Sequence, residues 1–244
     1  MQYIEPKNRY DRSQFSTKPV YMADFQRYLS RVFLYMFSGL AITALVAFLV
    51  SHSPKMLAFS INMSRGWNFL IPLFVYLALV LSFDVMIARA NTPMALLLFT
   101  LYSVVNGFQF SFIAIAFSMH TIWMAFLSAA ILFATMSVYG IVTKRDLSKM
   151  SRILFCGLIA ITIMTFINIL ILNSTGMDIM LSILGVVVFS AYTAYDIFRL
   201  RALYRQNIEE EQLNVIAVYG AFMLYLDFIY LFLYLLRLFG RRRD

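Results

Sequence analysis

Long apolar runs separated by short polar segments fill this chain from residue 32 to residue 240. A membrane-spanning helix needs about 20 mostly apolar residues, so charged residues mark natural boundaries between spans. The uncharged stretch Ala90–Thr143 is too long for one span, and we divide it near residues 117–121. The pattern then predicts an all-α polytopic membrane protein with seven transmembrane helices, at Val32–Val50, Trp67–Val85, Pro93–Ala116, Ile122–Ile141, Ile153–Leu172, Ile179–Asp196 and Leu213–Leu236.

The composition favours the same class. The chain is 62% hydrophobic and 13% charged, whereas soluble domains carry about 25% charged residues. Its mean hydropathy is +0.79, so much of the surface is expected to face a lipid bilayer. We divide the chain into a polar cytoplasmic leader (residues 1–31), a seven-helix membrane domain (32–240) and a basic tail (241–244). The leader lacks the apolar core of a signal peptide.

The net charge of +8 predicts membrane orientation and no nucleic-acid partner, because the cations lie between the apolar runs and at the chain ends. Fourteen Lys and Arg residues fall on the side of the amino terminus and two on the other, which predicts a cytoplasmic amino terminus. Four further arginines, Arg237 and Arg241–Arg243, would join the other side if the last segment spans fully. The last segment therefore either spans and tolerates this excess, or is re-entrant and returns the tail inside.

Two aspartates lie in consecutive apolar segments, Asp196 at the end of the sixth span and Asp227 near the middle of the seventh. An isolated carboxylate inside a membrane is costly unless it is paired, protonated or next to a polar cavity. Each aspartate also belongs to a helical stripe of polar, small and aromatic residues: Asp178, Ser182, Gly185, Phe189, Tyr192 and Asp196 in one segment, and Gly220, Met223, Asp227, Tyr230 and Tyr234 in the next.

We predict that Asp196 and Asp227 face each other and share a proton, because two carboxylates in a low-dielectric site do not readily both ionise. Such a pair would act as a proton-sensitive latch and, when both aspartates ionise, as a candidate Ca²⁺ contact. Arg89, the one cation between the second and third predicted spans, is a candidate counter-charge that holds a closed state.

Simpler roles stay open for each of these residues. The stripes would also serve as ordinary helix–helix contact faces. Asp196 would also be satisfied at the membrane boundary, solvated or paired with Arg199, and Asp227 by a hydrogen bond to Tyr230. Arg89 fits a positive-inside anchor. Polar residues inside other spans fit interhelical hydrogen bonds; these are Asn106, Gln109, Thr162, Thr165 and Asn168.

The sequence gives little support for an enzymatic activity or for a resident cofactor. The chain has no phosphate-binding glycine loop, no His-Glu-x-x-His and no Gly-x-Ser-x-Gly. One cysteine and two histidines are too few for a Cys- or His-based metal site. Two aspartates on consecutive helices resemble the layout of intramembrane aspartyl proteases. That family carries Gly-x-Gly-Asp at its second aspartate, whereas this chain reads Leu224-Tyr225-Leu226-Asp227. We therefore predict no enzyme and no cofactor.

The two aspartate segments resemble the transmembrane Bax-inhibitor-motif family, in particular its bacterial branch. Phe189-Ser-Ala-Tyr-Thr-Ala-Tyr-Asp196 is similar to the end of the family's sixth helix, and Leu224-Tyr-Leu-Asp227-Phe-Ile-Tyr-Leu-Phe232 with Leu235-Leu-Arg237 is similar to its final helix. Weaker similarity extends the resemblance over about residues 25–240, including Arg31–Leu40. The acidic run Glu209–Glu211 lies in a loop that is longer than the family's usual one.

The resemblance implies a last helix that is central and surrounded by the other six. It also implies a pH-sensitive calcium leak governed by a di-aspartyl pair, here Asp196 and Asp227, linked to an arginine that Arg89 matches by position. The transported ion would then be Ca²⁺ or another cation, and the location a bacterial inner membrane. The alternative is a non-conducting regulator that binds another membrane protein, since some bacterial relatives resemble partners of a membrane protease.

Overall fold

A computed structural model describes residues 19–63, 74–75, 78–79, 81–82, 85, 91–204 and 210–240, with side chains described from Asp24 onward. Within these residues all regular structure is helical. The elements are α1 (Pro19–Ser51), α2 (Pro54–Met63), α4 (Thr92–Phe110), α5 (Ile113–Ala116), α6 (Met119–Val142), α7 (Met150–Ile167), the π-helical turn η3 (Asn168–Leu172), α8 (Thr175–Tyr204) and α9 (Glu210–Gly240).

Six stretches of the described residues are long and apolar enough to cross a membrane: Asp24–Ser51, Thr92–Ala116, Met119–Val142, Met150–Leu172, Thr175–Tyr204 and Glu210–Gly240. They confirm six of the seven predicted spans and the all-α, polytopic class. The remaining predicted span, Trp67–Val85, lies mostly outside the described residues. The boundaries differ at two places. The first helix begins at Pro19, within the predicted leader, and α8 continues to Tyr204, so Asp196 lies inside this helix and not at its end.

Local sequence signals explain where several helices begin and end. Asn91 caps α4, its side chain accepting a hydrogen bond from the amide of Met94 at 3.0 Å, and a proline follows in the first turn. Ser118 caps α6 by accepting from the amide of Thr121 at 3.2 Å. The α7–η3 helix ends at Asn173, whose φ of 45° lies in the left-handed region that asparagine tolerates.

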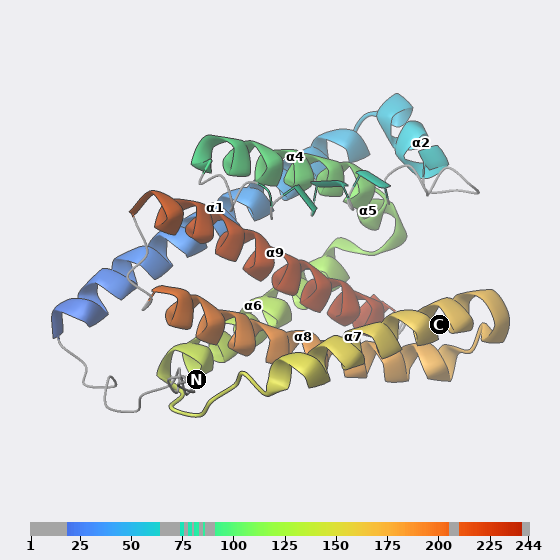
Figure 1. The fold of residues 1–244 in the computed structure, drawn as a ribbon. Helices are drawn as coiled ribbons and strands as arrows, with labels where there is room; N and C mark the ends of the chain where they lie inside the picture. The colour runs from blue at the N-terminus through green and yellow to red at the C-terminus, as the bar shows by residue number, and fades with distance from the viewer. Residues whose placement is uncertain are drawn as a thin grey trace, which may run out of the picture.

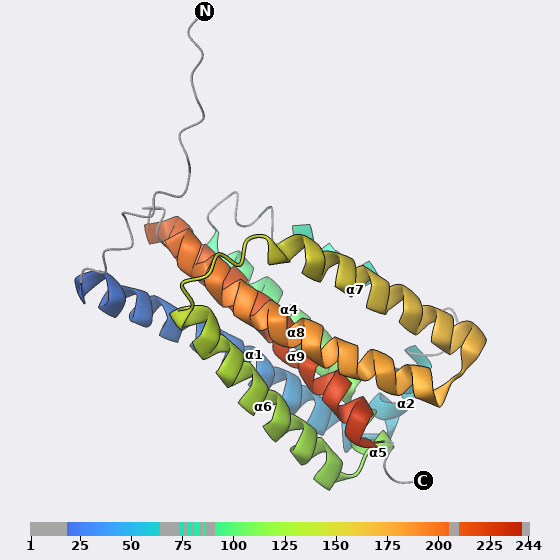
Figure 2. The same cartoon turned by 90° about the horizontal axis from the view of Figure 1, so that it is seen from below.

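Helix α9 lies between the α1–α4 pair and the α6–α8 pair and packs against all four helices (Figures 1 and 2). In its apolar window 78% of the residues are buried, against 17–39% in the other five spans. Helix α7 lies at an edge, beside α8 (Figure 2). Large apolar side chains of α7 and of the following η3 are mostly exposed, such as Ile153, Leu170 and Ile171 at 72–74%. Such side chains suit a surface that faces lipid.

Side-chain contacts fix the relative direction of neighbouring helices. Gly39 approaches Phe99 and Thr43 approaches Gly107, so α1 and α4 run parallel. Arg31 donates to the side chain of Asn214 and Thr43 contacts Tyr225, so α1 and α9 also run parallel.

Helices α8 and α9 run antiparallel. Leu200 packs on Gly220 near one end of the pair, and Gly185 packs on Tyr234 toward the other. This antiparallel pairing aligns the two predicted stripes along a common interface.

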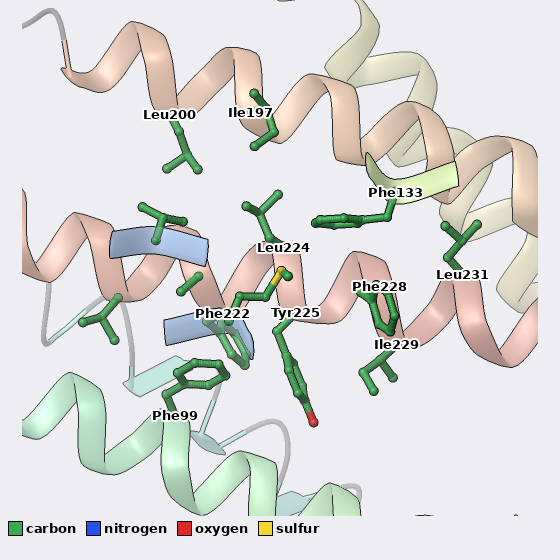
Figure 3. Packing of buried hydrophobic residues seen from close by; sticks show 14 of the residues in the cluster. Phe99, Phe133, Ile197, Leu200, Phe222, Leu224, Tyr225, Phe228, Ile229 and Leu231 are labelled. Atoms are coloured by element: carbon green, nitrogen blue, oxygen red, sulfur yellow. The ribbon is translucent and has the colours of Figure 1, made fainter. Parts of the chain in front are cut away.

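Helix α9 contributes more buried side chains to the core than any other described helix. Leu224 points toward Ile197 and Leu200 of α8, whereas Phe222 and Tyr225 point toward Phe99 of α4 (Figure 3). The rings of Phe99 and Phe222 lie 6.0 Å apart in an edge-to-face arrangement. Buried side chains thus join α9 to helices on both of its sides.

Candidate functional site

The two predicted site aspartates lie on facing sides of α8 and α9. Asp196 is 2% exposed and Asp227 is 4% exposed, in two helices that are both long enough to span a membrane. Each sits at its expected place on a stripe of residues spaced three or four apart, and helical geometry aims such a stripe at one neighbour. The alternative position for Asp196, solvated at the membrane boundary, does not fit this burial.

The carboxyl groups of Asp196 and Asp227 lie within hydrogen-bonding reach of each other. Oδ1 of Asp196 and Oδ2 of Asp227 are buried and have no hydrogen-bond partner among the described residues. Unpaired buried polar atoms are costly in a medium without water. The pair is therefore a polar contact enclosed by apolar helices, and two of its oxygen atoms can accept further hydrogen bonds.

The neighbours of the pair are an aromatic and a cationic side chain. Tyr192 lies close enough to interact electrostatically with both aspartates. Arg199 follows Asp196 by one helical turn and acts on it through its charge, but no ion pair within 4 Å joins them in the described structure. Its guanidinium instead contacts Sδ of Met223 at 3.8 Å and lies 6.0 Å from the ring centre of Tyr219. Direct Asp196–Arg199 pairing is thus absent from this part of the chain.

Aromatic rings continue the interface beyond the aspartates. Phe189 stacks on Tyr230 with ring centres 4.8 Å apart and on Tyr234 at 5.7 Å. The ring of Tyr230 packs against Phe189 in this stack. Among the described residues, the Tyr230 hydroxyl forms no hydrogen bond with Asp227. Gly185 lets the ring of Tyr234 approach closely, since an added Cβ would come within 2.6 Å of that ring. We call this line of residues, from the aspartate pair to Tyr234, the α8–α9 seam.

The seam offers few ligands for a resident metal. Ca²⁺ takes six to eight oxygen ligands in its protein sites, and the described residues contain no group of three or more His, Cys, Asp or Glu side chains. Asp196 and Asp227 alone provide two carboxylates. The predicted Ca²⁺ contact at these residues stays a prediction.

Arg89, the third predicted site residue, lies outside the described residues. Its predicted link to the aspartate pair therefore stays a prediction.

A second buried polar cluster, which the sequence analysis did not identify, lies on the opposite side of α9. The hydroxyl of Tyr225 contacts Oγ1 of Thr43 at 2.7 Å and accepts a hydrogen bond from Nδ2 of Asn106 at 2.9 Å. Thr43 also donates to the backbone carbonyl of Ser103 at 3.0 Å. Asn106 was predicted to bond between helices, and this bond confirms it. The sequence feature that could have identified Tyr225 is its hydroxyl group, which lies within an apolar run.

Comparison with known proteins places this arrangement in a family. Residues 25–244 match the family model described as "Inhibitor of apoptosis-promoting Bax1". The chain is 36% identical over 239 residues to the inner membrane protein YbhL of Escherichia coli, covering 97% of this chain and all of YbhL. It is 36% identical over 219 residues to a protein of Borreliella burgdorferi, covering 89% of this chain and 93% of that one. A membrane protein of Streptococcus pyogenes is 42% identical over 154 residues, 63% of this chain and 66% of its own length. These matches show that the chain is an integral membrane protein of the Bax inhibitor family.

Proposed function

We propose that this protein is a pH-sensitive leak channel for Ca²⁺, or for cations more widely, gated by the pair Asp196 and Asp227. The observation that carries the proposal is the meeting of these two carboxyl groups between two consecutive membrane helices, with one oxygen of each unpaired among the described residues. Carboxylate oxygens are the ligands that Ca²⁺ prefers. A protonatable pair inside a membrane is also a common element of proton-linked transport.

In the proposed mechanism the shared proton holds α8 and α9 together at the pair. With one proton between them, the carboxyl groups form a hydrogen bond that bridges the two helices. When that proton leaves, two like charges face each other in a low dielectric and repel. A change in protonation thus shifts the balance between a closed state, in which the carboxyl groups touch, and an open one. Tyr192 is placed to respond to the charge of both aspartates.

The proposed arrangement in the membrane has seven spans, with α9 central and surrounded by the other six helices, and the amino terminus in the cytoplasm of a bacterial inner membrane. The burial of α9 and its packing against four helices support a central position. Arg89 is proposed as the counter-charge of the aspartate pair in the closed state. We propose no enzymatic activity and no resident cofactor, and Ca²⁺ is the transported ion.

The test is Ca²⁺ entry into liposomes that contain the purified protein and an enclosed Ca²⁺ dye, measured from about pH 6 to pH 8, where a buried carboxyl pair can titrate. We expect a pH-dependent leak, and we expect Asp227→Asn and Asp196→Asn each to flatten its pH profile because neither variant retains two titrating carboxyl groups. A wild-type pH profile in Asp227→Asn would eliminate the pair as the sensor.

Asp146→Asn is the matched control, because it makes the same chemical change in an exposed loop between α6 and α7. Hydrogen bonds from Ser148 lower the pKa of Asp146 below its usual value. This carboxylate is therefore ionised throughout the assay range, and its replacement should leave the pH profile unchanged. Absence of Ca²⁺ entry at every pH would favour the non-conducting regulator, for which a co-purifying membrane protein is the expected finding.

A further inference from the structure

The segment that joins α6 to α7, together with the first turn of α7, carries a dense group of cations. Residues 143–152, which we call the basic loop, hold one aspartate and four exposed cations, namely Lys144, Arg145, Lys149 and Arg152. The segment passes across α8 on its way from α6 to α7 (Figure 2). It lies where the spans Met119–Val142 and Met150–Leu172 meet, which is the level expected for lipid headgroups.

The basic loop is held in place at several points. The side chain of Leu147 is only 5% exposed. Arg201 of α8 donates to the backbone carbonyl of Thr143 at 3.1 Å. Within the loop, Oδ1 of Asp146 accepts from the amide of Ser148 at 2.9 Å. A ligand that binds the cations would therefore lose little free energy in ordering the backbone that carries them.

The four cations of the basic loop have no ionic partner in the part of the chain that the structure describes. Asp146 interacts with Lys149 through its charge, but no ion pair within 4 Å joins any of the four to an acidic residue there. Other described cations toward the same end of the helices have partners in α1, in α9 or at the end of α6; these are Arg27, Arg31, Arg199 and Arg201. The basic loop thus differs from its surroundings in presenting fixed charge without a protein partner.

Helix α7 continues from these cations with an exposed apolar face. Arg152, Ile153 and Cys156 follow Lys149 by three, four and seven residues, so all four lie on one face of the helix. Ile153 is 72% exposed, and Cys156 is exposed as well. Cys156 lies about 10 Å further along the helix axis than Lys149. Cations at the level of the headgroups, followed by an exposed apolar face, match the two parts of a phospholipid.

We propose that the basic loop and the start of α7 bind an anionic phospholipid, with its phosphate among the cations and its acyl chains along Ile153 and Cys156. Charge complementarity selects the headgroup, because a zwitterionic lipid brings a cation together with its phosphate. Each Lys or Arg near an anionic lipid surface strengthens binding about fivefold. The site lies outside the α8–α9 seam and does not depend on the passage of Ca²⁺.

Cys156, the single cysteine of the chain, provides the reporter for a test. The purified protein is labelled there with bimane and placed, one copy per disc, in nanodiscs of phosphatidylcholine. The discs contain increasing fractions of phosphatidylglycerol or of phosphatidylcholine with brominated acyl chains, since bromine quenches only nearby fluorophores. We expect brominated phosphatidylglycerol to quench at a roughly tenfold lower fraction than brominated phosphatidylcholine. Lys149→Gln combined with Arg152→Gln should bring the two lipids to parity.

Two matched variants separate a binding site from the effect of net charge. Arg27→Gln combined with Lys55→Gln removes two exposed cations of α1 and α2 and should keep the preference for phosphatidylglycerol. Lys149→Arg combined with Arg152→Lys retains both charges and should keep it as well. Loss of the preference in either matched variant would overturn the proposal. Thermal unfolding checks that each variant is folded, and Lys144→Gln combined with Arg145→Gln tests the same loop a second time.

The other candidate occupants give different results. Equal quenching of the wild-type protein by the two lipids would overturn the proposal. Relief of the quenching by soluble glycerol phosphate would assign the cations to a free phosphate ester and would overturn the lipid. Self-quenching between labelled copies in liposomes, without lipid quenching in nanodiscs, would assign the face to a second copy of the chain and would overturn it too. The readout contains no Ca²⁺, so the lipid site and the proposed leak can fail separately.

Discussion

The hydroxyl oxygen of Tyr225 lies 2.7 Å from the hydroxyl oxygen of Thr43 and so joins α9 to α1 inside the membrane domain. Asn106 of α4 donates to the same hydroxyl at 2.9 Å. One phenol therefore links three helices on the side of α9 that faces away from the aspartate pair. Tyr225 is fully buried, so this link has no competition from water.

Replacing Tyr225 by Phe should destabilise the protein by about 0.5–1.5 kcal/mol, because interhelical hydrogen bonds in membranes have about this strength. The phenylalanine keeps the ring contacts with Phe99 and Tyr102, so only the hydrogen bonds change. The measurement is thermal unfolding in detergent. Tyr139→Phe, at an exposed tyrosine of α6, is the control. Equal stability of the two variants would contradict a role for the hydroxyl in holding the helices.

Two glycines mark places where helix backbones approach too closely for a side chain. An added Cβ at Gly107 would lie 2.6 Å from the backbone oxygen of Thr43, and one at Gly140 would lie 2.6 Å from that of Ala194. Backbone atoms cannot yield as a flexible side chain can. Gly107→Ala and Gly140→Ala should therefore each destabilise the fold by about 1–3 kcal/mol, as overpacking does.

Gly157 of α7 is the matched control for these two substitutions, since its nearest contact would be an ordinary 3.6 Å to Val188. Gly157→Ala should be neutral or stabilising by up to about 1 kcal/mol through helix propensity. Thermal unfolding of the three variants, measured side by side, tests whether close backbone approach causes the loss of stability. A loss in Gly157→Ala as large as in the other two would show that close approach is not the cause.

Arg201, in the last turn of α8, closes the end of α6. Its guanidinium donates to the backbone carbonyls of Ile141 and Thr143, which the helix end leaves without intrahelical partners. Arg201→Gln should release the following loop and speed tryptic cleavage after Lys144 and Arg145 several-fold in detergent. Arg152→Gln, on the exposed face of α7, should leave that cleavage unchanged. Cleavage at the wild-type rate in Arg201→Gln would contradict a role for Arg201 in holding this loop.

Much of the fold was accessible from the sequence because lipid imposes a simple rule. Each span has to satisfy its backbone internally, so an apolar run of sufficient length becomes a helix. The ends were harder to place. Helix α8 continues eight residues past Asp196, since nothing in Ile197–Tyr204 breaks a helix, whereas the charge at Arg199 suggested a membrane boundary. The residue at which an apolar run ends therefore need not be the residue at which its helix ends.

The candidate site was predictable as far as spacing on one helix determines it. The stripes of α8 and α9 were read correctly, and the facing of Asp196 and Asp227 follows from the antiparallel pairing of two consecutive helices. Contacts between helices far apart in the chain were not predictable. The bond of Tyr225 to Thr43 has no local signal, because it depends on how α1 and α9 are shifted along each other.

The direction of α1 and α9 predicts the side of the carboxyl tail, which charge counting left open. Arg31 of α1 contacts Asn214 near the start of α9, and Thr43 contacts Tyr225 about three helical turns further along both helices. The two helices therefore cross the membrane in the same direction. Helix α9 is unbroken from Glu210 to Gly240, about 46 Å at 1.5 Å per residue, and has no turn at which a re-entrant segment would return. The two chain ends should therefore lie on opposite sides.

Reporter fusions test this topology. With a cytoplasmic amino terminus, a fluorescent protein fused there should fluoresce, and alkaline phosphatase fused after Asp244 should be active, since it folds only outside the cytoplasm. A fluorescent protein inserted after Asp146, on the predicted inner side, is the control. Helices α1, α4 and α9 all run in the same direction, since α1 packs parallel to each of the other two. A fluorescent carboxyl-terminal fusion would place both ends inside and would contradict the seven-span arrangement. Arg237 and the three arginines of the tail would then be the residues that decide its side.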